Sequence, residues 1–252
     1  MSQNIFDNDV FFKKYSELRK QEHSYNNLVE QPAIQALLPE LRGKAVLDLG
    51  CGHGGNCIDF VNKGAAGVVG VDISEKMLGV ARKENSHELI KYMVMDMSEI
   101  GRLKQKFDLA FSSFAFHYVK DFLKLLRDIR FLLNENGILL FSQEHPYTSA
   151  PKCGPSWTKD AHGIKIHYNL SDYMCSGIRH AKFFANSDDI VEKYHRPLSE
   201  IIGSIISQGF MINNVIEPVP DEYALKKRPD LYDEFHKTTC VIIKATKMQI
   251  NT

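Results

Sequence analysis

The sequence lacks an excess of charge of either sign, a paired-cysteine pattern and a long apolar run. Its 252 residues carry 31 Lys and Arg against 31 Asp and Glu, so bulk electrostatic attraction to nucleic acid is not expected. The five cysteines form no C-x-x-C pair, which disfavours a disulfide framework or a zinc site. No stretch approaches the roughly 18 apolar residues that a membrane crossing needs.

These absences also bear on location and partners. The N-terminal stretch MSQNIFDNDVFFKK has no long apolar core, so we expect no secretory signal. Reduced thiols then favour a cytoplasmic protein with neither a membrane nor a nucleic-acid partner. His162 and His167 are too widely and flexibly spaced to indicate a metal site, and we expect no metal. The chain would be a monomer or a homodimer.

Short apolar segments alternate with amphipathic ones from residue 44 onward. The apolar segments predict five strands, namely AVLDLG, GVVGVD, YMVMD, FDLAFSS and GILLFSQEHP. Helices are predicted between them at about 56–62, at 74–84 with Ser74 as its cap, and at 121–133, the last ended by residues 134–137. Such alternation implies right-handed crossovers and a parallel sheet that is covered on both faces.

A glycine-rich turn, GCGHGG at residues 50–55, directly follows the first predicted strand. Glycines let the backbone turn tightly and approach a ligand, while the next helix offers free N–H groups. Asp72 lies 22 residues beyond Gly50, at the end of the second strand. A carboxylate there can accept both hydroxyls of a ribose, so the pattern indicates a site for a nucleoside cofactor.

The kind of nucleoside is decided by the neighbouring acids. Read literally, the turn also satisfies G-x-G-x-x-G, the dinucleotide fingerprint. Asp48 counts against a dinucleotide, because it places a negative charge where a pyrophosphate would bind. Asp96 ends the third strand and is followed by Met97, and an acid beside a free backbone N–H suits an adenine. A helix cap before Ser98 is the alternative for Asp96.

Four motifs occur in a fixed order: VLDLGCGHGG, GVDISEKML, VMDM and FDLAFSSFAFHYV. Over about residues 44–145 the chain therefore resembles the class I S-adenosylmethionine-dependent methyltransferases. The resemblance implies an α/β, Rossmann-like fold: a seven-stranded, mostly parallel sheet with helices on both faces and an antiparallel last strand. It also implies S-adenosylmethionine as cofactor and S-adenosylhomocysteine as product. SSFAFHYV and FSQEHP are similar to the branch that includes quinone-biosynthesis enzymes, so a small-molecule acceptor is expected.

The same resemblance implies a set of cofactor contacts. They are Gly50, Cys51, Gly52 and Gly54 around the methionine part, Asp48 near its ammonium, Asp72 on the ribose, Ile73 and Met77 against the adenosine, Asp96 and Met97 at the adenine, and Ser112 and Ser113 below the ammonium and the acceptor pocket. In the N-terminal stretch, Tyr15 could lie on the cofactor and Arg19 could meet its carboxylate. The alternative is a helix whose aromatic side is simply core.

Methyl transfer is an in-line displacement, so the protein supplies alignment, a water-poor pocket and sometimes a base. His117, which follows the fourth strand, is the leading candidate for that base. The alternatives are a structural histidine bonded to a backbone carbonyl and a histidine that touches only the cofactor. His145, at the carboxyl end of the fifth strand, and His195, in VEKYHRPL, are further candidates. A turn-stabilising role is the alternative for His145.

We expect one domain. Its parts are an N-terminal helical cover (1–43), a cofactor-binding core (44–145), an inserted cap or lid (146–196) and a C-terminal part that completes the sheet (197–252). Helical spacing is predicted over residues 10–42, with Pro39 closing the second helix. Two other function classes stay open: an NAD(P)-dependent oxidoreductase, and a protein that binds S-adenosylmethionine without catalysis.

Overall fold

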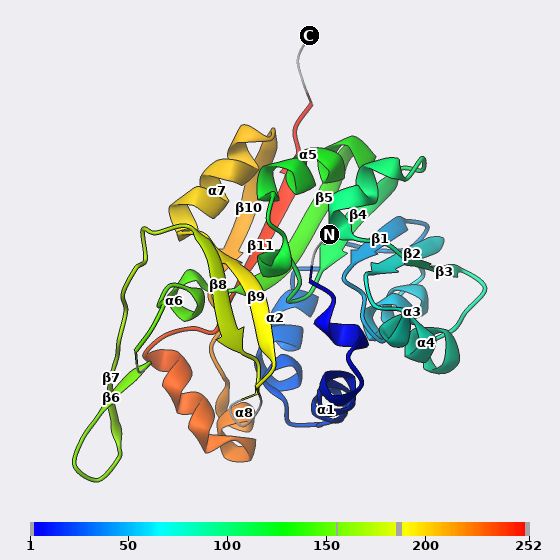
Figure 1. Cartoon of the computed structure of the whole chain (residues 1–252). Coiled ribbons are helices and arrows are strands. Elements are labelled where there is room, and N and C mark those ends of the chain that lie inside the picture. The colour runs from blue at the N-terminus through cyan, green and yellow to red at the C-terminus, as the bar shows by residue number, and fades with distance from the viewer. Residues whose placement is uncertain (1–2, 155, 185–187, 250–252) are drawn as a thin grey trace.

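The computed structural model describes residues 3–154, 156–184 and 188–249, and its centre is an open seven-stranded sheet (Figure 1). The strand order is β10-β11-β5-β4-β1-β2-β3. Neighbours among β1 to β5 pair in parallel, whereas β11 is antiparallel to both β5 and β10. This topology confirms the predicted Rossmann-like sheet with an antiparallel last strand.

The elements have the following bounds. The strands of the sheet are β1 (Ala45–Leu49), β2 (Gly67–Asp72), β3 (Ile90–Val94), β4 (Phe107–Ser112), β5 (Leu133–Glu144), β10 (Phe210–Ile216) and β11 (Cys240–Lys247). The helices are α1 (Asp9–Arg19), α2 (Gln31–Gln35), α3 (Gly55–Asn62), α4 (Glu75–Glu84), α5 (Phe122–Leu132), α6 (Pro146–Ser149), α7 (Leu198–Ser207) and α8 (Glu222–Lys227). Shorter helical turns cover Ile5–Asp7, Asn26–Glu30, Met97–Arg102, Phe116–Tyr118 and Pro229–Phe235.

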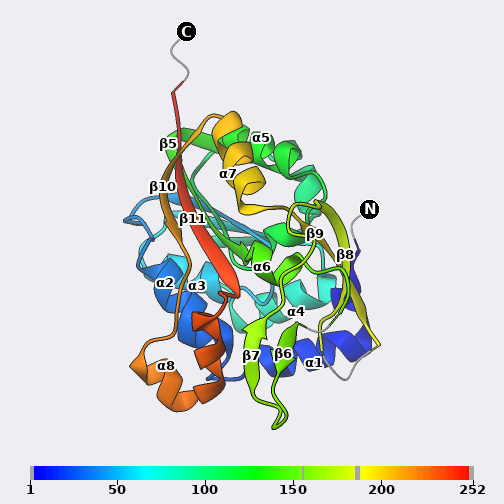
Figure 2. The same cartoon turned by 90° about the vertical axis from the view of Figure 1, so that its left-hand side faces the viewer.

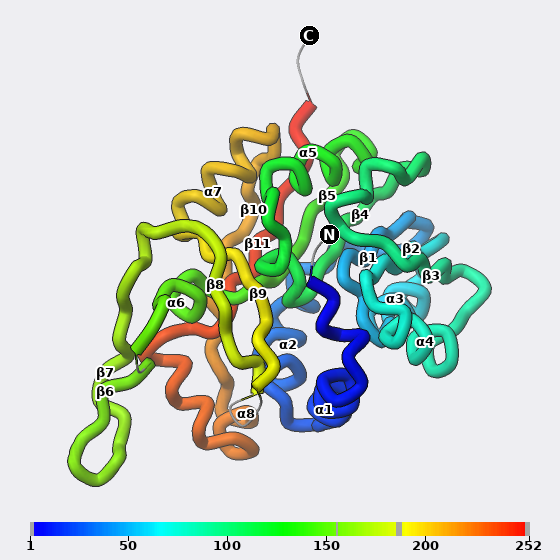
Figure 3. Tube along the Cα trace, viewed as in Figure 1, coloured from blue at the N-terminus to red at the C-terminus, as the bar shows by residue number. Residues whose placement is uncertain are grey.

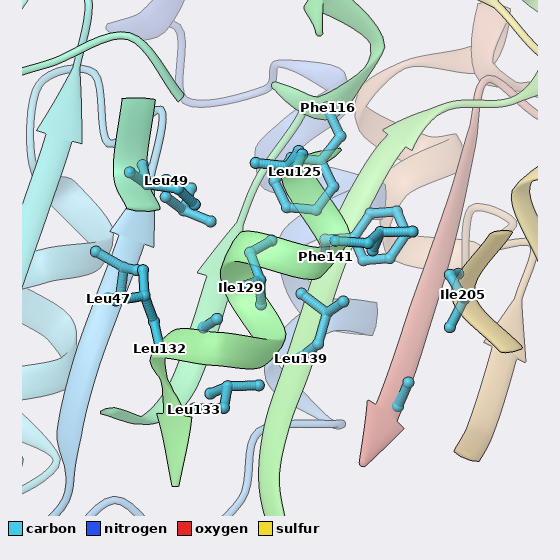
Figure 4. Packing of buried hydrophobic residues seen from close by; sticks show 14 of the residues in the cluster. Leu47, Leu49, Phe116, Leu125, Ile129, Leu132, Leu133, Leu139, Phe141 and Ile205 are labelled. Carbon is cyan, nitrogen blue, oxygen red and sulfur yellow. The ribbon is translucent and has the colours of Figure 1, made fainter. Parts of the chain in front are cut away.

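Each face of the sheet packs its own hydrophobic layer. On one face the buried side of α5, which carries Leu125, Ile129 and Leu132, packs against Leu139 and Phe141 of β5 (Figure 4). The intervals of four and three residues place these α5 side chains on a single helix face. A second layer, which includes residues of α2, α3 and α4, covers the opposite face. Burial of each such side chain stabilises the folded state by about 1.5–3 kcal/mol, so the two layers stabilise the sheet from both faces.

Two small hairpins lie between α6 and α7. They are β6 (Trp157–Lys159) with β7 (Lys165–Tyr168), and β8 (Gly177–Lys182) with β9 (Ile190–His195), both antiparallel. The first hairpin extends away from the sheet (Figures 2 and 3). Side-chain hydrogen bonds join the second to the N-terminal segment, because Gln3 donates to the Ile190 carbonyl at 2.9 Å and accepts from the Glu192 N–H at 2.8 Å.

Some predicted boundaries were wrong. The N-terminal helices are short: α1 ends at Arg19, and α2 ends at Gln35, before Pro39. The Asn27 side-chain amide donates to the carbonyls of residues 21 and 22 and so stabilises the turn that separates the helices. The predicted end of the third helix before residues 134–137 is confirmed, because α5 ends at Leu132. The strand that follows starts earlier than predicted: β5 begins at Leu133, and a shift in its pairing with β4 absorbs the left-handed Asn136, whose φ is 61°.

The helices also bear on a membrane location. Within residues 3–154, 156–184 and 188–249, none is both long and apolar enough to cross a bilayer.

Candidate active site

A cavity of about 650 Å³ opens at the carboxyl ends of β1, β2 and β4. Many of the residues predicted for the site line it: Tyr15, Arg19, Gly50, Cys51, Gly52, Asp72, Ile73, Met77, Asp96, Met97, Ser113 and His117. Five others are not part of its wall, namely Asp48, Gly54, Ser112, His145 and His195. The topology therefore brings together residues that lie more than a hundred positions apart in the sequence.

The glycine loop after β1 depends on left-handed backbone. The φ angles of Gly50, Gly52 and Gly54 are 73°, 54° and 79°, a region that other residues adopt only at a cost. A Cβ atom on Gly50 would lie 2.5 Å from the Ala115 Cβ, and one on Gly54 would lie 2.2 Å from the Tyr92 hydroxyl oxygen. A Cβ on Gly52 would meet nothing within 4 Å. Gly50 and Gly54 thus allow close packing, while Gly52 leaves room for a ligand.

Asp72 connects this loop to the end of β2. Its Oδ2 accepts a hydrogen bond from the Gly52 N–H at 2.9 Å, and its Oδ1 accepts one from the Ser74 N–H at 2.9 Å. Burial raises the pKa of Asp72, although these two hydrogen bonds act to lower it. A carboxylate has about four lone-pair positions, so Asp72 can still accept hydroxyl groups from a ligand in the cavity.

Asp48 lies outside the wall of the cavity and is buried. The Cys57 thiol donates to its Oδ2 at 3.2 Å, and its Oδ1 has no hydrogen-bond partner among the described residues. Burial raises the pKa of Asp48 to about 7. An unpaired buried carboxylate oxygen is stabilised by a nearby cation and destabilised by a nearby anion.

The structure shows the capping role that the sequence allowed for Asp96 and places the residue in the cavity wall, where contact with an adenine stays a prediction. Its Oδ1 accepts from the Ser98 N–H at 2.9 Å and so caps the turn Met97–Arg102, and the residue also lines the cavity. Met97, Ile73 and Met77 line the cavity too and supply apolar surface there. This part of the wall can accept a flat, polar-edged ring.

Two hydroxyl groups, one just after β4 and one on β5, donate to the buried Glu30 at the end of the turn Asn26–Glu30. The Ser113 hydroxyl donates to Glu30 Oε1 at 2.9 Å, and the Ser142 hydroxyl donates to the same oxygen at 2.7 Å. Burial raises the pKa of Glu30, and the two hydroxyls act to lower it. Ser112 differs from Ser113, because its hydroxyl donates to the Leu49 carbonyl at 2.7 Å inside the sheet. Glu30 therefore fixes the loop that leaves β4.

His117 and Glu144 form the other end of the cavity. His117 is 3% exposed, and its Nδ1 accepts a hydrogen bond of 3.3 Å from the Glu144 N–H. Burial lowers the pKa of His117 to about 4, although the Glu144 carboxylate acts to raise it. Burial acts to raise the pKa of Glu144, but its ion pair with Lys193 and the proximity of His117 hold it below the ordinary value.

His145 and His195 do not reach the cavity, so the expectation that they are catalytic does not fit the geometry. Nδ1 of His145 accepts from the Tyr147 N–H at 3.1 Å at the start of α6, and its Nε2 lies 2.7 Å from Glu217 Oε1. His195 has Ser149 Oγ 2.9 Å from Nδ1 and the Tyr173 carbonyl 2.8 Å from Nε2. Both ring nitrogens of each histidine are therefore used in structural hydrogen bonds.

Aromatic side chains form part of the cavity wall. Tyr15 makes ring contacts with Phe6, Phe183 and His53 at centroid distances of 5.3, 5.8 and 6.4 Å. Both readings of Tyr15 are compatible with this placement, since the ring packs in a cluster and also lines the cavity. Arg19, one helical turn further along α1, is exposed at the rim.

The geometry also bears on a metal site and on the dinucleotide alternative. Across the residues that the structure describes, no group of three His, Cys, Asp or Glu side chains could hold a metal ion. The buried Asp48 places a carboxyl group next to the glycine loop, which suits a positively charged nucleoside better than a diphosphate, whereas Asp72 suits the ribose of either.

Comparisons with known proteins agree with this assignment. The family model of a methyltransferase domain matches residues 47–141. The crystal structure of an S-adenosylmethionine-dependent methyltransferase from Mesorhizobium loti is 36% identical, with a TM-score of 0.79 over 86% of this chain and 97% of that one. An uncharacterized protein of Haemophilus influenzae is 36% identical over 98% of both chains.

A more distant match covers less than half of each chain. A ubiquinone biosynthesis O-methyltransferase of Coxiella burnetii is 34% identical over 104 residues, which make up 40% of this chain and 44% of that enzyme. The fold, the glycine loop with Asp72, and the similarity along almost the whole length of the Mesorhizobium enzyme lead to one assignment. The chain belongs to the class I S-adenosylmethionine-dependent methyltransferases, and S-adenosylmethionine is its cofactor.

Proposed function

We propose that the chain transfers the methyl group of S-adenosylmethionine to a small-molecule acceptor. The observation that carries this proposal is that one cavity is lined both by Gly50 to Gly52 and by His117, Tyr118 and Glu144. Its volume of about 650 Å³ is typical of small-molecule sites. The distant likeness to the Coxiella enzyme of ubiquinone biosynthesis supports the same class of acceptor.

In this proposal the cofactor residues keep the roles that the sequence suggested. The methionine part lies along the glycine loop with Asp48 beneath its cationic end, Asp72 binds the ribose, and Asp96 with the Met97 N–H binds the adenine. When bound, the cofactor supplies a methyl group on a positively charged sulfur. The chain's own task is then to orient the acceptor and to exclude water.

The acceptor would occupy the end of the cavity next to His117. Phe114 and Tyr25 lie on one side of this space, with ring centroids 6.1 Å apart, and Tyr118 lies on another, 5.9 Å from Phe6. These rings offer a large apolar surface with few polar groups, as pockets for organic ligands do. A ring or chain of modest size is the acceptor that suits such a space.

The proposal is tested by turnover. The purified chain is incubated with methyl-deuterated S-adenosylmethionine and a panel of phenols, carboxylic acids, thiols and amines, and both S-adenosylhomocysteine and the labelled product are measured by mass spectrometry. We expect acceptor-dependent formation of both. Transfer of label only to added RNA or protein would contradict the proposal. Binding of the cofactor with no transfer to any acceptor would favour a non-catalytic protein.

A further inference from the structure

The backbone N–H of Glu144 determines which ring nitrogen of His117 carries the proton. A backbone N–H can only donate, so the 3.3 Å hydrogen bond from the Glu144 N–H requires a lone pair on His117 Nδ1. A neutral imidazole carries one proton. That proton must therefore be on Nε2, and Nε2 makes no hydrogen bond to any residue that the structure describes.

This arrangement does not suit a general base. A base would need a lone pair on the nitrogen that faces the acceptor, and hence the tautomer with the proton on Nδ1. In that tautomer Nδ1 cannot accept, so the hydrogen bond from the Glu144 N–H is lost. This N–H would then be left without its acceptor beside a buried ring. Forming the imidazolium breaks the same bond, since Nδ1 is protonated in that state as well.

Charged groups around the ring do not reverse this preference. Glu144, from β5, would stabilise an imidazolium, but its carboxylate is paired with Lys193 from β9. Lys193 and Arg196 are both buried cations and oppose a positive charge on His117. Burial of the ring acts in the same direction and keeps the pKa of His117 near 4. The ring of Tyr118 also packs against His117, with the two ring centroids 4.1 Å apart.

We infer that His117 acts as a neutral hydrogen-bond donor through Nε2–H and that the methyl acceptor is an oxyanion, such as a carboxylate or an ionised phenol. This inference rests on the proposed function and specifies the acceptor for it. An oxyanion has three lone pairs, so it can accept from Nε2–H and attack with another pair. An amine has a single lone pair, and a hydrogen bond from Nε2–H would occupy the pair that must attack.

The reaction balances without a base. An oxygen lone pair forms the new bond to the methyl carbon while the bond from that carbon to sulfur breaks. The electrons of the broken bond stay on sulfur, which becomes a neutral thioether. The negative charge of the acceptor and the positive charge of the sulfonium cancel, and no proton is released. The role of His117 is to hold the attacking oxygen in line with the methyl group.

The first test needs no acceptor. Calorimetry first establishes that the chain binds S-adenosylhomocysteine, and long-range ¹H–¹⁵N NMR spectra of the histidine rings are then recorded on that complex between pH 5.5 and 9, with His117→Gln to assign the signals. We expect the His117 proton on Nε2 and no titration in this range. A proton on Nδ1, or an ionisation within the range, would overturn the inference. Failure to bind S-adenosylhomocysteine would instead count against the proposed function.

The second test uses matched acceptors. Turnover of benzoate, 4-nitrophenolate and longer carboxylates is compared with that of benzylamine and 4-nitroaniline. We expect methyl esters or ethers and no methylated amine. Turnover of the amines alone, or of none of the oxyanions, would contradict the inference, while transfer to amines would leave the proposed function standing.

Variants of His117 separate donation from base catalysis with whichever oxyanion is turned over. His117→Phe removes the donor and should lower kcat/KM by about 10- to 150-fold, the value of a hydrogen bond to a charged group. His117→Gln keeps an N–H donor and should recover most of the loss. If His117 were a base, both variants should lose the same fraction of kcat/KM. If it were merely structural, the variants should unfold at a lower temperature with unchanged kcat/KM. Affinity for S-adenosylhomocysteine, measured in parallel, should not change.

Discussion

The Gly52 N–H donates a hydrogen bond of 2.9 Å to Oδ2 of Asp72 and so joins the loop after β1 to the end of β2. The other carboxylate oxygen accepts from the Ser74 N–H and fixes the start of α4. One side chain thus shapes the glycine loop and faces the cavity. The conformation of the loop and the affinity for the cofactor should therefore depend on each other.

Asp72→Asn should weaken binding of S-adenosylhomocysteine by about 10- to 150-fold, because a charged hydrogen-bond acceptor contributes about 1.5–3 kcal/mol. Isothermal titration calorimetry measures the change. The matched control is Asp108→Asn, since Oδ2 of Asp108 also accepts a backbone N–H, that of Ala45 at 2.9 Å, but lies outside the wall of this cavity. Equal affinities of the two variants would contradict the role of Asp72.

The glycines of the loop should differ in what they tolerate. Gly52→Ala places a side chain in left-handed backbone with free space around it and should lower the free energy of unfolding by about 1–2 kcal/mol. Gly50→Ala adds the collision with Ala115 and should lose about 1–3 kcal/mol more. Urea unfolding measures both. In the binding assay Gly52→Ala should still lose affinity, because its new methyl group enters the ligand space; identical stabilities would refute the packing argument.

The raised pKa of Asp48 predicts that the chain becomes less stable as the pH rises toward neutrality. Its pKa is about 7 in the folded chain, against about 3.9 in an unfolded one. The folded state thus holds a proton that the unfolded state has lost, so the free energy of unfolding should fall as pH rises from about 4 to about 7, by on the order of 4 kcal/mol. Asp48→Asn should flatten the curve over this range.

Two other buried carboxyl groups complicate this measurement. Burial also raises the pKa values of Glu30 and Asp72, which adds a slope of the same sign. The quantity to compare is therefore the difference between wild type and Asp48→Asn at each pH, from urea unfolding. A difference that stays constant between pH 4 and 7 would show that Asp48 ionises normally.

Substitution of Glu30 should disturb the segment just after β4, which the proposal places next to the acceptor, more than it weakens binding of the cofactor. Glu30→Ala leaves the hydroxyls of Ser113 and Ser142 without their common acceptor and should lower the free energy of unfolding by about 1–3 kcal/mol. Glu30→Gln retains one oxygen and should lose less. We also expect Glu30→Ala to lower kcat, because Phe114, which follows Ser113 and has a φ of 52°, would lose support. Unchanged kcat with reduced stability would limit Glu30 to folding.

The parts of the site that the sequence predicted are local patterns. The glycine turn and the acids that end β2 and β3 each belong to one strand and the residues just after it, so their placement follows once the strands are parallel. The structure puts Gly52, Asp72 and Asp96 on the wall of one cavity. The parallel pairing of β1 to β5 follows from the alternation of strands and helices, whereas the strand order, in which β4 lies beside β1, has no local signal.

The histidines show what local patterns miss. His145 and His117 both follow strands at the carboxyl edge of the sheet and are equivalent by that criterion. They differ in a partner that is distant in the sequence: Nε2 of His145 lies 2.7 Å from Glu217 Oε1. Of the two histidines, His117 lines the cavity and His145 does not. Glu30 was missed as a network residue because Ser113 and Ser142 lie 83 and 112 positions away. Contacts of this kind have no signature in a single sequence.

The most direct test is a calorimetric titration of the purified chain with S-adenosylhomocysteine and, separately, with NAD⁺. Because Asp48 is buried next to the glycine loop, the cavity should bind the sulfur nucleoside at one site per chain and bind the diphosphate weakly or not at all. Saturable binding of NAD⁺ with no heat from S-adenosylhomocysteine would contradict the account.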